Sequence, residues 1–346
     1  MSSNGRSDDK NYNYSKLALA FIALNAVVWW ILFSLGRSSL DTYGDMAEAY
    51  SWGISWQWGY DKHPPLSAWT APAWFELFPA SDWAYYLLAM VNQAIAFWFV
   101  FLAGKRWLTP AQALVAVMLT SLVPLFGPDT GFKFNANSAM LPWVAIFAWS
   151  LMVALQTGAR RYVIVAGLAA GAACLVKYWA PVMLSAITLG SLLIVYRSKS
   201  LTWRPTLGKL LAVSGLTMLV FFPHFSWAVT HHWPGLSYAH AAHELVAGST
   251  GVASTFDLLT DLLLVALLPT LAWAASMLYV RKTSSKTAVQ TAAPCLTDAD
   301  AHPRPTKVQG ASIFVFAVLF TAESAHLAGV AVASKWLIPA WLFFAW

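Results

Sequence analysis

Long apolar runs without charged side chains are the feature that most restricts how this chain can fold. The first run covers residues 17–35 and contains no Asp, Glu, Lys or Arg. A helix of about 20 such residues crosses the hydrocarbon layer of a bilayer, where backbone amides must be hydrogen-bonded within the segment. Only 10% of the 346 residues are charged, against about 25% in soluble domains. The sequence therefore predicts an all-α, polytopic transmembrane bundle.

We expect a single domain built from ten spans. Their approximate ranges are 17–35, 83–103, 111–126, 138–155, 162–176, 180–196, 210–229, 258–280, 312–330 and 336–346. The polar break at Lys177 separates two spans, because one straight helix of that length would overshoot the ~30 Å hydrocarbon layer. Residues 283–309 are expected to form a flexible cytoplasmic loop. The last apolar run stops at Trp346, so we expect a C-terminal part to be missing.

Basic residues predict the orientation of the spans. With a cytoplasmic N-terminus, every basic cluster between spans falls on the cytoplasmic side, as the positive-inside rule requires. These clusters are Lys105-Arg106, Arg160-Arg161 and the regions 197–209 and 281–307. The formal net charge of +6 is therefore a topology signal and does not indicate nucleic-acid binding. The polar loops at 36–82, 127–137 and 230–255 then share the outer, periplasmic face of a cell inner membrane.

Three acids follow the first span. Asp41, Asp45 and Glu48 recur at helical spacing, and residues 45–56 are expected to form a short helix. A second juxtamembrane helix is expected over residues 67–78. Crowded carboxylates at a membrane face raise the proton affinity of one of them toward that of a general base. The alternative is a solvated face of an interfacial helix, and periodicity alone does not choose between these interpretations.

Cations follow on the same side. The turn Lys62-His63-Pro64-Pro65 is stiffened by its prolines and could present an ammonium and an imidazole to an anion such as a lipid phosphate. Lys177, followed by Tyr178, occupies the bend between two spans. The competing interpretations are a turn with incidental cations and a lysine that extends to the membrane interface.

Loop histidines raise the question of a metal. His240, His243 and Glu244 are weak candidate ligands, but their spacing matches no strong metal motif, so exposed loop histidines are the favoured interpretation. No metal site is predicted from these residues.

The loop after the first span resembles that of bacterial glycosyltransferase family 39. This family is related to the dolichyl-phosphate-mannose protein mannosyltransferases and to the aminoarabinose transferase that modifies lipid A. The matching residues are Gly44-Asp45-Met46, Trp58-Gly59-Tyr60 and Lys62-His63-Pro64-Pro65-Leu66. Two further stretches are similar to family patterns, namely Pro223, Trp227, His231 and Trp233, and the pair Lys177-Tyr178.

The resemblance implies the GT-C fold and a polyprenyl-phosphate-linked sugar as donor. It implies an inverting transfer to a hydroxyl of a lipid, glycan or protein, with Asp45 as the catalytic base and Asp41 as second choice. Donor phosphate contacts would come from Lys62, His63, Lys177, Tyr178 and His231. Metal need stays open, since some relatives bind zinc and many need none, and no other cofactor is implied.

Two other function classes compete with this one. A transporter or flippase of lipid-linked sugars would place ionisable groups near the bilayer midplane and show internal repeats. Here the polar residues gather at the outer ends of spans, and no clear repeat is present. A scaffold subunit would not explain why separate loops bring acids and cations to one face.

Overall fold

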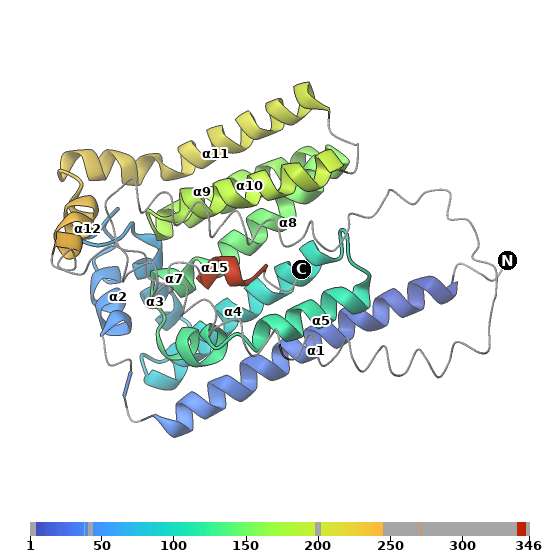
Figure 1. The fold of residues 1–346 in the computed structure, drawn as a ribbon. Helices are drawn as coiled ribbons and strands as arrows, with labels where there is room; N and C mark the ends of the chain where they lie inside the picture. Colours follow the sequence, from blue (N-terminus) through green and yellow to red (C-terminus); the bar gives the residue numbers. More distant parts are fainter. Residues whose placement is uncertain are drawn as a thin grey trace.

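The computed structural model describes residues 5–37, 39–40, 44–197, 202–244, 271 and 338–343. All regular elements in these ranges are helical (Figure 1). The longer ones are α1 (Gly5–Gly36), α4 (Asp82–Gly104), α5 (Pro110–Ser121), α8 (Leu141–Thr157), α9 (Arg160–Val176), α10 (Ala180–Arg197) and α11 (Trp203–Thr230). The spans expected at 258–280 and 312–330, and the loop at 283–309, lie outside the described residues.

The centre of the bundle is formed by α4, α8 and α9, with α1 packed on α4 and α11 packed on α9 (Figure 1). Two glycines allow α9 and α11 to approach closely. A Cβ added at Gly167 would lie 2.5 Å from Leu216, and one at Gly171 would lie 2.5 Å from Val220. Small residues at a helix crossing are typical of membrane bundles, where close backbone approach supplies the packing energy.

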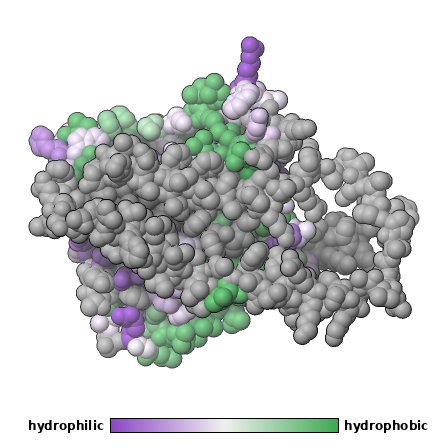
Figure 2. All heavy atoms as spheres, in the orientation of Figure 1, coloured by the Kyte–Doolittle hydropathy of each residue, from purple (hydrophilic) through white to green (hydrophobic). Residues whose placement is uncertain are grey.

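Large apolar side chains on α1 and α11 point outward. Leu24 is 63% exposed and Leu219 is 69% exposed. In Figure 2, hydrophobic residues gather along the two edges where Figure 1 places α1 and α11. By length and composition, four helices in the described part of the chain can cross a membrane: Asn13–Gly36, Asp82–Gly104, Ala136–Thr157 and Trp203–Thr230. A lipid environment accounts for this exposed apolar surface.

Helix α5 ends at Ser121, five residues before the end of the span expected at 111–126. Pro124 and Pro128 lack the N–H that would continue the helix, and Gly127 has a φ of +94°. The backbone N–H of Gly127 instead donates to Oε1 of Gln93 on α4 at 3.1 Å. Short segments then lead back into the bundle: η1 (Leu125–Asp129), α6 (Thr130–Phe132) and α7 (Ala136–Ala139).

Two short helices cover one end of the bundle, here called the site end. They are α2 (Asp45–Gly53) and α3 (Leu66–Phe75), close to the expected juxtamembrane helices. A Cβ at Gly53 would lie 2.1 Å from the carbonyl oxygen of Ala68, so glycine permits the contact between them. The hydroxyl of Tyr85 on α4 donates to the carbonyl of Met46 at 2.8 Å, which ties α2 to the bundle. Helix α12 (Pro234–Glu244) lies at the same end (Figure 1).

Candidate active site

Asp45 is the first residue of α2. Gly44 precedes it with φ +76°, a left-handed conformation that glycine adopts without strain, and this turns the chain into the helix. A carboxylate in a first turn is stabilised by the unpaired N–H groups there. Oδ2 of Asp45 also accepts a hydrogen bond from Nδ2 of Asn135 at 3.0 Å. The side chain thus points toward the loop that precedes α7.

Asn135 is held in a single orientation by the start of α7. Its side-chain Oδ1 accepts from the backbone N–H groups of Asn137 at 3.0 Å and Ser138 at 3.3 Å. In return, the Asn135 backbone N–H donates to Oγ of Ser138 at 2.8 Å, which completes a capping box. Because the amide oxygen serves these donors, the amide nitrogen faces the Asp45 carboxylate, which must accept.

Lys62 pairs with Glu48. Its Nζ lies 2.6 Å from Oε2 of Glu48, and both side chains are about one-third exposed, at 29% and 32%. The ammonium also lies 5.7 Å from the ring centroid of Trp52 and 5.4 Å from that of Tyr238, within the range of cation–π attraction. Burial acts to lower the pKa of Lys62, but the hydrogen bond and charge of Glu48 outweigh it, so the pKa is raised. Lys62 is therefore a permanent cation.

His63 is close enough to Lys62 and Lys177 to be affected by both charges. Burial, followed by the positive charges of Lys177 and Lys62, lowers the pKa of His63 to about 3. His63 is therefore neutral at physiological pH and its ring hydrogen-bonds to the backbone of Lys62, so the positive charge at this place comes from the two lysines. Lys177 lies just after α9, and its ammonium donates to Oδ1 of Asn137 at the start of α7.

The neutral state of His63 predicts a pH-dependent stability. In the unfolded chain His63 takes up a proton near its ordinary pKa of 6.5, whereas in the folded chain it does so only near 3. The unfolded state then binds more protons between these values, so stability falls as pH falls through this window. Thermal unfolding in detergent at pH 7.5, 5.5 and 4.5 should show this loss, and His63→Gln should flatten it. Parallel curves for the two proteins would contradict the assignment.

Tyr178 and His231 belong to a second group of contacts around α11. His224 Nδ1 lies 2.6 Å from the carbonyl oxygen of Trp58, and its Nε2 lies 3.0 Å from the Tyr178 hydroxyl. Because a carbonyl only accepts, Nδ1 carries the proton and Nε2 accepts from Tyr178. The exposed His231 stacks on Trp227 with ring centroids 4.3 Å apart. This group fastens the loop after α2 to α9 and α11.

Gly59 permits this fastening, because a Cβ there would lie 2.2 Å from the Trp227 ring. We expect Gly59→Ala to displace either the loop or the indole, at a cost of about 1–3 kcal/mol for overpacking. The midpoint of thermal unfolding in detergent should fall. Gly215→Ala is the matched control, since nothing lies within 4 Å of its added Cβ. Equal midpoints for the two variants would contradict the predicted contact.

Four predicted residues lie wholly or partly outside the described part of the structure. Asp41 lies outside the described residues. The backbone of His240, His243 and Glu244 belongs to α12, but their side chains lie outside the described part of the structure. Among the residues that the structure describes, no group of three or more His, Cys, Asp or Glu side chains is arranged to hold a metal ion.

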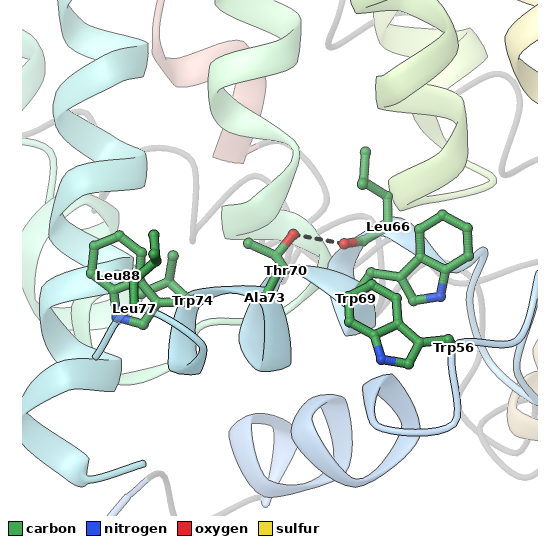
Figure 3. A pocket seen from close by; sticks show the side chains of 8 residues that line it. All are labelled: Trp56, Leu66, Trp69, Thr70, Ala73, Trp74, Leu77 and Leu88. Carbon is green, nitrogen blue, oxygen red and sulfur yellow. Dashed lines mark hydrogen bonds between the residues drawn. The ribbon is translucent and has the colours of Figure 1, made fainter. Parts of the chain in front are cut away.

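An open apolar cavity of about 410 Å³ lies beside α3 (Figure 3). It is lined by Trp56, Leu66, Trp69, Thr70, Ala73, Trp74, Leu77 and Leu88. The indole N–H of Trp69 donates to the carbonyl of Gln57 at 2.9 Å, and that of Trp74 to the carbonyl of Ala84 at 2.8 Å. With their polar atoms bonded to backbone, these rings present apolar surface, as interfacial tryptophans do.

The structure thus brings Asp45, Glu48, Lys62, His63 and Lys177 into one group, here called the polar cluster. Asn135 and Asn137 join it, although the sequence reasoning did not select them as site residues. The run Asn135-Ala136-Asn137-Ser138 before an apolar span is a helix-start signal that could have marked them. His224 was not selected as a site residue either, since a lone histidine in an apolar span carries no pattern of its own.

Comparisons with known proteins agree with the fold and with the family resemblance. Residues 62–227, just under half of the chain, match the family model described as dolichyl-phosphate-mannose-protein mannosyltransferase. This confirms the predicted resemblance to a GT-C mannosyltransferase family. No curated protein matches the chain.

Two crystal structures of ArnT from Cupriavidus metallidurans are similar to this chain. The one bound to undecaprenyl phosphate has a TM-score of 0.67 at 15% identity and covers 96% of this chain. The apo structure has a TM-score of 0.64 at 14% identity and covers 94% of this chain. The chain spans 59% and 57% of the lengths of these two ArnT chains. The likeness confirms a polytopic helical bundle of the GT-C type, and with the apolar spans it indicates a multi-pass membrane protein.

Proposed function

We propose that this chain is an integral-membrane glycosyltransferase that moves a sugar from a polyprenyl-phosphate donor to a hydroxyl acceptor. One observation carries the proposal: a carboxylate and two lysines from three separate segments meet at the site end. Asp45 comes from the start of α2, Lys62 from the loop after α2, and Lys177 from the bend after α9. Lys62 interacts electrostatically with Asp45, and the positive charges of both lysines lower the pKa of His63.

The proposed reaction is a direct displacement at the anomeric carbon. Asp45 accepts the proton of the acceptor hydroxyl while the acceptor oxygen forms the new bond to that carbon. The bond between the anomeric carbon and the phosphate oxygen breaks, and its electron pair leaves with the polyprenyl phosphate. Lys62 and Lys177 stabilise the negative charge on this leaving group. The attack from the opposite face inverts the configuration of the sugar.

The side chains at the site end support a polyprenyl-phosphate donor. The ammonium groups of Lys62 and Lys177 can bind its phosphate. The neighbouring cavity at α3 offers aromatic and aliphatic surface to its isoprenoid chain (Figure 3). The solved ArnT structure with undecaprenyl phosphate supports a lipid phosphate ligand for this fold. We extend that ligand class to this chain as part of the proposal.

The same proposal includes the orientation in a cell inner membrane, with the N-terminus cytoplasmic and the polar cluster periplasmic. Supporting contacts lie at the end of the bundle away from the polar cluster. Lys105, which follows α4, donates to Ser15 on α1 at 3.2 Å, and Arg106 donates to Gln156 near the end of α8 at 2.7 Å. Basic residues therefore gather at the opposite end, as the positive-inside rule requires of the cytoplasmic side.

The test is an assay of the purified protein in vesicles with a panel of polyprenyl-phosphate sugars and lipid, glycan and peptide acceptors. We expect one donor to be consumed, with release of polyprenyl phosphate and a glycosylated product of inverted anomeric configuration. A product of retained configuration would overturn the displacement mechanism. Movement of the donor across the bilayer without transfer would overturn the enzyme assignment in favour of a flippase.

A further inference from the structure

The start of α7 contacts two members of the polar cluster at once. Asn135 donates to the Asp45 carboxylate, and Asn137 accepts from the Lys177 ammonium. Asp45 lies 90 residues from Asn135 in sequence, and Lys177 lies 40 residues from Asn137. The two asparagines are separated by a single residue, Ala136, so one short turn joins two distant parts of the site.

This turn is rigid. The Asn135 side chain closes the capping box with Ser138, and the carbonyl of Ser138 accepts from Nδ2 of Asn92 on α4 at 2.6 Å. Asn137 and Ser138 are buried, at 6% and 2% exposure. The turn leads directly into the span Ala136–Thr157, 83% of whose apolar window is buried inside the bundle. The turn therefore fixes the positions of Asp45 and Lys177 relative to the core of the bundle.

We propose that Asn135 and Asn137 are positioning residues, which set the Asp45 carboxylate and the Lys177 ammonium relative to each other across the reacting bond. The inference rests on the proposed function and adds to it a role for the loop at residues 127–137. Asn135 orients the base because its side-chain oxygen accepts from backbone N–H groups of α7, which leaves its side-chain nitrogen facing the Asp45 carboxylate. Asn137 orients the cation that receives the leaving phosphate. Neither residue has to touch the substrate to do this.

Two matched substitutions separate positioning from a general structural role. Asn135→Asp keeps a good helix cap but faces Asp45 with an acceptor in place of a donor. Asn137→Asp changes the same atoms two residues later, but it gives Lys177 a permanent anionic partner. Both variants have the same change in size and charge. A merely structural role predicts the same kinetic defect for both, whereas positioning predicts two different defects.

For Asn135→Asp we expect kcat to fall about 10–100-fold, the range of one hydrogen bond to a charged group. The acidic limb of its pH–rate profile should also move upward by about one pH unit, because two facing carboxylates retain a shared proton. The other charged members of the polar cluster are Glu48 on α2, Lys62 from the following loop and Lys177, which contacts Asn137. The ion pair Asp129–Lys133 precedes Asn135 in the same loop. Asn135→Ser, which caps but is too short to reach Asp45, should lower kcat without moving the limb.

For Asn137→Asp we expect the KM for the donor, and the dissociation constant of undecaprenyl phosphate itself, to rise about tenfold, because the new carboxylate competes with phosphate for Lys177. The kcat should change less than in Asn135→Asp. Gln57→Glu is the control for added negative charge, since Gln57 is exposed and its hydrogen bonds with Tyr60 and Trp69 are made by its backbone. Its kinetic constants should match those of the unmodified protein.

The outcomes are distinguishable. Parallel losses in kcat and KM in both variants, or an unmoved pH limb in Asn135→Asp, would overturn the positioning role while leaving the transferase assignment intact. A wild-type protein that transfers no sugar from any donor in the panel would overturn the proposed function, and this inference with it. Thermal unfolding in detergent, measured for each variant, identifies any loss that comes from misfolding.

Discussion

Asp45→Asn should abolish sugar transfer while the protein still inserts and folds. The oxygen of the new amide can accept the hydrogen bond from Asn135 Nδ2 that the carboxylate accepts at 3.0 Å, so the local structure is retained. The amide cannot take a proton from the acceptor hydroxyl. Loss of a general base costs about 10²–10⁴-fold in rate. Transfer measured under single-turnover conditions with saturating donor isolates this chemical step.

The matched control for this substitution is Asp82→Asn. Asp82 is an exposed acid at the start of α4, at the same end of the bundle but outside the polar cluster. This variant should keep its transfer rate, and both variants should show the same expression and melting behaviour as the unmodified protein. Near-normal transfer by Asp45→Asn would contradict the assignment and move the role of base to Glu48 or Asp41.

Lys177→Met should give the second large loss. The ammonium of Lys177 lies in the bend after α9, held by Asn137 and close enough to His63 to help lower its pKa. Its removal leaves the departing phosphate with Lys62, which is already paired with Glu48 at 2.6 Å. Removal of one preorganised group that stabilises developing charge costs about 10²–10³-fold in kcat. Methionine keeps an unbranched apolar side chain that ends where the lysine ammonium begins, so packing is disturbed little.

Steady-state kinetics against donor concentration measures this effect, with Lys209→Met as control. Lys209 belongs to α11 near Gly158, at the opposite end of the bundle. A Lys177→Met protein with unchanged kcat and unchanged donor KM would contradict the phosphate role. A defect in Lys209→Met as large as that in Lys177→Met would show that the loss reflects membrane insertion rather than chemistry.

The ionisation states and partners of Glu48 and His63 could not be predicted from the sequence. Their place in a loop with other ionisable residues predicted that they belong to the site, but it did not predict their state. Glu48 forms an ion pair with Lys62. Its role in this structure is therefore that of a counter-ion to Lys62 rather than that of a base. His63 is neutral, because burial and the positive charges of Lys177 and Lys62 lower its pKa. Such states depend on burial and on charges contributed by other segments, which residue spacing does not record.

The helices themselves follow from the sequence, because an uncharged apolar run in a bilayer must satisfy its backbone internally and only a helix does so within one segment. The juxtamembrane helices α2 and α3 follow likewise from local spacing and from the Pro64-Pro65 stop. The early end of α5 required the structure, since the contact of Gly127 with Gln93 depends on how α4 packs. The partners of Asp45 and Lys177 were also decided by tertiary structure. Asn135 and Asn137 reach them through the packing of α2, α7 and α9, and side-chain pairing across such distances depends on the rotation and depth of each helix in the bundle.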